Sequence, residues 1–67
     1  MIKIKVNGRA WEVPAQANVT DLLARFKIAP QVCVVEKNGK ILNREEYNKI
    51  SFSASDEIEI IRMMGGG

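Results

Sequence analysis

The sequence of 67 residues contains no histidine, one cysteine and two prolines. Without histidine, the protein lacks the commonest general base and cannot build a zinc site that needs an imidazole ligand. A single cysteine excludes an internal disulfide and a cysteine-cluster metal site. We therefore expect no metal, and most self-contained enzyme chemistries are not expected here. Any chemistry should use a chain terminus or take place inside a partner protein.

Aromatic residues are also scarce, at 6% of the chain, and ten basic residues are scattered among eight acidic ones. Nucleic-acid binding usually needs a concentrated basic face with aromatics among it. The longest apolar run has four residues, at 32–35, whereas a membrane-spanning helix needs about 20. The first residues lack the apolar core of a secretory signal. We expect a cytoplasmic protein with neither nucleic-acid nor membrane partners.

The first 13 residues alternate between apolar and polar side chains, as in a strand with one buried face. Asn7 and Gly8 interrupt the alternation with a strong signal for a two-residue hairpin turn. The pattern predicts an antiparallel hairpin that ends at Pro14. Its predicted inner face consists of Ile2, Ile4, Val6 and Trp11.

A helix of about ten residues is predicted next. Asn18 can cap its first turn, and Asp21 can complete a capping box. Pro30 prevents the helix from continuing. Four apolar residues then share one helix face: Val19, Leu22, Leu23 and Phe26.

The β-branched run at 32–35 predicts a central strand covered on one side by the helix. Cys33 lies inside this run, which favours a buried thiol over a reactive one. Asn38-Gly39 predicts a second turn, followed by a short strand at residues 41–42.

Residues 44–47 are predicted to form one helical turn, and residues 57–62 alternate again as a last strand. A hairpin, one main crossing helix and further strands make an α+β roll with a mixed sheet of four to five strands. This is the order of the β-grasp, or ubiquitin-like, fold. We assign residues 1–64 to this domain and residues 65–67 to a flexible glycine tail.

A β-grasp domain followed by Met63, Met64 and three glycines resembles the ThiS-type sulfur carriers of thiamin-thiazole biosynthesis. The resemblance covers essentially the whole chain. Its local signals are residues 18–23, 34–41, 44–47 and 56–60, but the terminal glycines are the most specific. One departure concerns a turn, because Ser55 stands where the family usually has glycine.

The resemblance implies that an ATP-dependent, E1-like adenylating enzyme activates the terminal carboxylate of Gly67. A sulfur donor, such as a desulfurase carrying a persulfide, would then convert it to a thiocarboxylate. Thiazole synthase or an analogous acceptor would receive the sulfur. The carrier would be a cosubstrate and not an enzyme, with no permanently bound cofactor, and ATP would be bound by the partner.

Gly65 and Gly66 suit a tail that threads into a narrow active site, because glycine has no Cβ to clash. We predict that Ile61, Arg62, Met63 and Met64 form the docking surface for partners, since methionine adapts to more than one surface.

Three alternatives remain open from the sequence. The chain could carry sulfur for molybdopterin as the small subunit of that synthase, although its compact middle favours the thiazole branch. It could be a ubiquitin-like protein modifier. It could also be a β-grasp interaction module whose glycine tail is inert.

Overall fold

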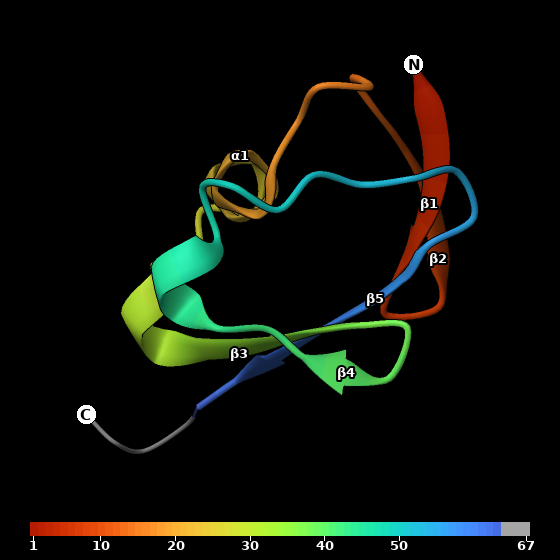
Figure 1. Cartoon of the computed structure of the whole chain (residues 1–67). Coiled ribbons are helices and arrows are strands. Elements are labelled where there is room, and N and C mark those ends of the chain that lie inside the picture. The colour runs from red at the N-terminus through yellow and green to blue at the C-terminus, as the bar shows by residue number, and fades with distance from the viewer. Residues whose placement is uncertain (64–67) are drawn as a thin grey trace.

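The computed structural model of the protein describes residues 1–63, which form one mixed sheet with a helix across one face (Figure 1). In chain order the elements are β1 (Ile2–Val6), β2 (Arg9–Val13), α1 (Val19–Arg25), η1 (Pro30–Val32), β3 (Cys33–Lys37), β4 (Lys40–Ile41), η2 (Arg44–Glu46) and β5 (Glu57–Arg62). The strand order is β2-β1-β5-β3-β4. Only β1 and β5 pair in parallel. The predicted β-grasp fold is confirmed.

Both asparagine–glycine pairs form the tight turns that the sequence predicts. Asn7 and Gly8 have φ of 51° and 83°, and Asn38 and Gly39 have φ of 54° and 84°. Positive φ at both central residues is the geometry of a type I′ turn, whose twist matches that of the flanking strands. These turns fix the register of the β1–β2 and β3–β4 hairpins.

Helix α1 begins as predicted. The Asp21 N–H donates to Asn18 Oδ1 at 2.8 Å, and the Asn18 N–H donates to Asp21 Oδ2 at 3.0 Å. This reciprocal pair is a capping box, and it satisfies backbone donors that the first turn cannot pair internally.

The helix is shorter than the predicted ten residues, because Val19–Arg25 contains seven. Lys27 adopts a left-handed conformation with φ of 59°. Its N–H donates to the Ala24 carbonyl, and the Ile28 N–H donates to the Leu23 carbonyl. These two bonds form a Schellman motif, which closes the helix well before Pro30. The sequence predicted that Pro30 would stop the helix, but Lys27, in its left-handed conformation, ends it earlier.

The middle strand of the sheet is β5, and the run at 32–35 supplies β3, which is an interior strand between β5 and β4 as predicted. β5 lies between β1 and β3. Val32 belongs to the η1 turn, so β3 begins only at Cys33. The short strand β4 spans Lys40–Ile41 rather than residues 41–42, and it lies at the sheet edge beside β3.

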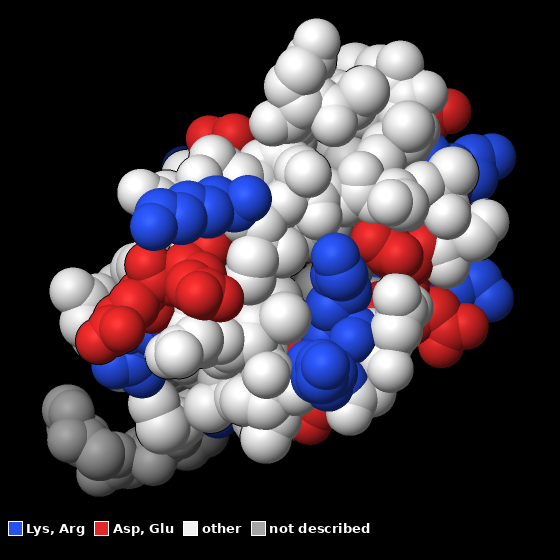
Figure 2. All heavy atoms as spheres, in the orientation of Figure 1, with Lys and Arg blue, Asp and Glu red and all other residues white. Residues whose placement is uncertain are grey.

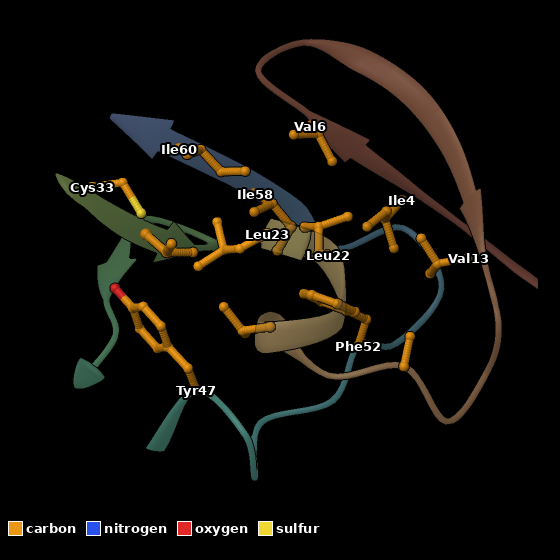
Figure 3. Close-up of a cluster of buried hydrophobic side chains, with 13 residues drawn as sticks. Ile4, Val6, Val13, Leu22, Leu23, Cys33, Tyr47, Phe52, Ile58 and Ile60 are labelled. Carbon is orange, nitrogen blue, oxygen red and sulfur yellow. The ribbon is translucent and has the colours of Figure 1, made fainter. Parts of the chain in front are cut away.

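The core lies between α1 and the inner face of the sheet (Figure 3). Sheet residues Ile4, Val6, Ile58 and Ile60 point toward Leu22 and Leu23 of the helix. The predicted inner face of the hairpin is confirmed: Ile4 and Val6 are buried, and Ile2 and Trp11 are partly buried and pack against the core. Val13, which pairs with Ile2, is buried on the same face. The side of the core is closed by two aromatic residues, Tyr47 and Phe52.

A buried carboxylate organises the loop before β5. The Ser53 N–H and Asn38 Nδ2 donate to Asp56 at 2.8 and 3.0 Å, and the Glu57 N–H donates to Asn38 Oδ1. Ser55 adopts φ of 73° within this loop. The β3–β4 turn and the start of β5 are therefore joined through side-chain hydrogen bonds.

Candidate functional site

Strand β5 ends at Arg62, shortly before the terminal glycines on which the predicted chemistry depends. Ile61 pairs with Val34, and Arg62 pairs with Cys33. The Met63 N–H then donates to the Val32 carbonyl at 2.8 Å. This ladder fixes the direction of the chain as far as Met63, at the end of the molecule away from the N-terminus (Figure 1).

Apolar side chains are exposed at this end of the sheet. Ile61 is 47% exposed, Met63 49% and Val32 40%, and Val34 is half-buried. Exposed apolar side chains that lie together are typical of a protein-binding surface. We call Val32, Val34, Ile61 and Met63 the outer apolar patch.

The predicted docking residues do not share one face. Side chains alternate along a strand, so Ile61 lies on the outer face while Arg62 follows buried Ile58 and Ile60 on the helix side. The period-two alternation of the strand, continued to residue 62, is the sequence signal that assigns Ile61 and Arg62 to opposite faces. Whether these residues dock a partner stays a prediction.

Met64, Gly65, Gly66 and Gly67 lie outside the described residues. Their predicted roles in docking, threading and activation stay predictions, as does the division into a domain at 1–64 and a tail at 65–67.

Cys33 is fully buried, as the sequence predicts, and its Sγ lies 3.9 Å from the Pro30 carbonyl oxygen. Burial raises the pKa of the Cys33 thiol, while the positive charges of Arg44 and Arg62 oppose that shift in pKa. A buried neutral thiol is a poor nucleophile, because the thiolate is the reactive form. Cys33 therefore acts as a small core residue.

Figure 2 shows basic and acidic side chains interspersed on the face that it draws. Among residues 1–63, no group of three or more cysteine or carboxylate side chains could hold a metal ion. No helix in the described part of the chain is long and apolar enough to cross a bilayer.

The ThiS family model matches residues 4–67, which includes the three glycines after Met64. The chain belongs to the ThiS family. The sulfur carrier protein ThiS of Bacillus subtilis is 30% identical over 66 residues, covering 96% of this chain and 98% of that protein. The crystal structure of the thiamine biosynthesis protein ThiS from Geobacter metallireducens superposes with a TM-score of 0.82. The two chains are 35% identical, and the match covers 98% of this chain and 100% of the Geobacter chain.

A thiazole synthase of Paramagnetospirillum magneticum also matches this ThiS-family chain. It is 27% identical over 66 residues, which are 98% of this chain and 20% of the synthase. A segment similar to this chain thus forms part of a longer protein named thiazole synthase.

Proposed function

We propose that the protein carries sulfur as a thiocarboxylate on Gly67 for thiazole formation in thiamine biosynthesis. The observation that carries the proposal is the family match, which extends through the glycines to Gly67 on a β-grasp domain. The carrier is a cosubstrate, not a catalyst. Because the activation consumes ATP, we place the protein in the cytoplasm.

The proposed activation begins at the Gly67 carboxylate, which is a poor electrophile until it carries a good leaving group. An E1-like enzyme joins the carboxylate to the α-phosphate of ATP, which releases pyrophosphate and leaves an acyl-adenylate. The persulfide of a desulfurase attacks the acyl carbon and displaces AMP. A thiol reductant then attacks the desulfurase sulfur of the resulting acyl disulfide, which releases the thiocarboxylate and leaves a mixed disulfide between the reductant and the desulfurase cysteine.

The β5 ladder supports this role by holding the chain up to Met63 on a rigid strand. The five residues from Met63 to Gly67 would span roughly 16–18 Å when extended. This length suffices to reach a buried active site from the domain surface. Ordering such a tail costs entropy, so the folded domain must supply docking energy.

We assign that docking to the outer apolar patch, which includes Met63, the last described residue. Its mixture of β-branched side chains and a methionine suits two successive partners, the adenylating enzyme and the sulfur acceptor. Thiazole synthase is the acceptor that the relatives support, because one of them contains a ThiS-like segment. Two modules in one polypeptide meet at a high effective concentration.

The test incubates the purified protein with an E1-like adenylating enzyme, ATP, a desulfurase and a thiol reductant. Intact mass spectrometry should show a gain equal to the replacement of one oxygen by sulfur. A chain that lacks residues 65–67 should keep its fold by circular dichroism but gain no mass. Ile61→Lys should slow loading, whereas Ile41→Lys, at the exposed edge strand β4, is the matched control.

Loading of the shortened chain would refute the role of Gly67.

After loading, the full-length protein should form the thiazole with a thiazole synthase. Sulfur transfer only to a molybdopterin synthase would place the protein in that branch, and isopeptide conjugates in cells would indicate a protein modifier.

A further inference from the structure

A groove of about 300 Å³ opens on the helix side of the sheet, between the tip of the β1–β2 hairpin and the end of α1. Aromatic and aliphatic side chains form its walls, and none of its lining residues is acidic. Its lining includes Arg9, Trp11, Phe26, Ile28, Ile60 and Arg62. This groove is distinct from the outer apolar patch, because it lies on the other face of β5.

The two aromatic rings in the groove are held in place. The centroids of Trp11 and Phe26 lie 4.9 Å apart, with an angle of 85° between the ring planes. The Arg25 guanidinium lies 5.2 Å from the centroid of the Trp11 ring. Both rings are only half-buried. The groove therefore offers a rigid, partly exposed apolar surface, which binds an apolar side chain with little loss of entropy.

Two residues of β5, Ile60 and Arg62, line the same groove. The Met63–Val32 hydrogen bond makes Arg62 and Cys33 a non-hydrogen-bonded pair, so the Arg62 N–H and C=O point away from β3. The parallel partner β1 stops at Val6, which pairs with Ile58. Within residues 1–63, no strand lies beside Arg62 on that side.

Asn7 closes the gap as far as Ile60. The Ile60 N–H donates to Asn7 Oδ1 at 2.8 Å, and Asn7 Nδ2 donates to the Ile60 carbonyl at 3.4 Å. The carboxamide thus replaces one residue of a neighbouring strand. Beyond it, a strand edge and an apolar groove lie together, which is the combination by which sheets bind extended peptides.

We propose that this groove binds an extended, acidic segment of a partner protein. Main-chain groups of the segment pair with Arg62, one large apolar side chain packs against Trp11 and Phe26, and a neighbouring carboxylate meets the guanidiniums of Arg9 and Arg62. Two arginines and no lining acid select against basic segments. The proposal does not depend on the chemistry at Gly67.

The test uses an acetylated, amidated hexapeptide with one phenylalanine flanked by glutamates. Trp11 is the only tryptophan of the chain, so its fluorescence reports directly on the groove. Amide chemical shifts of Ile60, Arg62 and Phe26 should move in parallel. Replacing the glutamates by glutamine should weaken binding about tenfold, and 0.5 M salt should weaken it too. Replacing phenylalanine by alanine should weaken it by a similar factor.

Arg9→Gln and Arg62→Gln should each lower the affinity several-fold. Lys40→Gln is the matched control, because β4 lies at the opposite edge of the sheet from β2. Equal binding of the glutamine peptide, or shifts confined to Val34 and Ile61, would overturn the proposal. If a shortened protein that ends at Met63 bound the peptide tenfold more tightly, the occupant of the groove would be the protein's own last residues. That result would overturn the proposal as well.

Discussion

Replacing Ser55 by glycine should stabilise the protein. Ser55 has φ of 73° and is exposed, in the loop that leads into β5. Left-handed backbone costs a residue with a Cβ roughly 1–2 kcal/mol. Glycine avoids that cost but loses about 0.5–1 kcal/mol more conformational entropy on folding. The one backbone bond that Ser55 donates, to the Lys3 carbonyl at 2.8 Å, is kept by glycine.

The net expectation for Ser55→Gly, taken as the middle of the range that these two costs leave, is a gain of about 0.5–1 kcal/mol in the free energy of unfolding. In a domain of this size the melting temperature should rise by roughly 2–8 °C. Urea unfolding followed by Trp11 fluorescence measures the change with an unchanged m-value.

Ser53→Gly provides the matched control in the same loop. Ser53 does not have positive φ, so glycine there only adds entropy to the unfolded chain and should destabilise by about 0.5–1 kcal/mol. Equal effects of the two substitutions, or a loss of stability in Ser55→Gly, would refute the argument from backbone strain.

Lys27→Gly should also stabilise, by about 0.5–1 kcal/mol, because Lys27 holds the left-handed position of a Schellman motif; thermal unfolding measures it. Asp56→Ala should cost about 2–4 kcal/mol in urea unfolding, since two hydrogen bonds to a buried carboxylate are lost, whereas exposed Glu57→Ala should stay within about 0.5. Cys33 should react with a thiol reagent only as fast as the protein unfolds. Burial raises the pKa of the folded Cys33 thiol above that of the unfolded thiol, which is about 8.5. The contribution of the buried neutral thiol to the free energy of unfolding is therefore complete below the unfolded pKa and is lost as pH rises through the folded pKa. The stability difference between wild type and Cys33→Ala should therefore shrink from pH 8 to pH 10, and a constant difference would contradict this sign.

Local signals predicted most elements well. Asn7-Gly8 and Asn38-Gly39 placed both hairpin turns, and the capping box placed the start of α1, because each signal depends on residues close in sequence. The last strand was predicted at its observed bounds, since residues 57–60 alternate cleanly. The helix end was missed, because lysine rarely takes the left-handed position that glycine usually fills.

The candidate site was predicted less completely. Ile61 and Met63 of the outer apolar patch were predicted, but Val32 and Val34 were not, because they join the patch only through the pairing of β3 with β5. Ile61 and Arg62 were placed on one surface although they lie on opposite faces of β5. The groove beside Arg62 had no signal in the sequence, because its walls come from β2, the end of α1 and β5.

The sequence by itself determined the order of the elements, the type of both hairpin turns and the family resemblance, because these reside in neighbouring residues and in a short glycine motif. Only the tertiary structure decided that β5 is the central strand and that β1 stops at Val6, which leaves the edge of Arg62 beside an apolar groove. The physical reason is that strand pairing is a long-range choice. It depends on which edges and faces the whole chain buries together, and no local pattern of side chains specifies that.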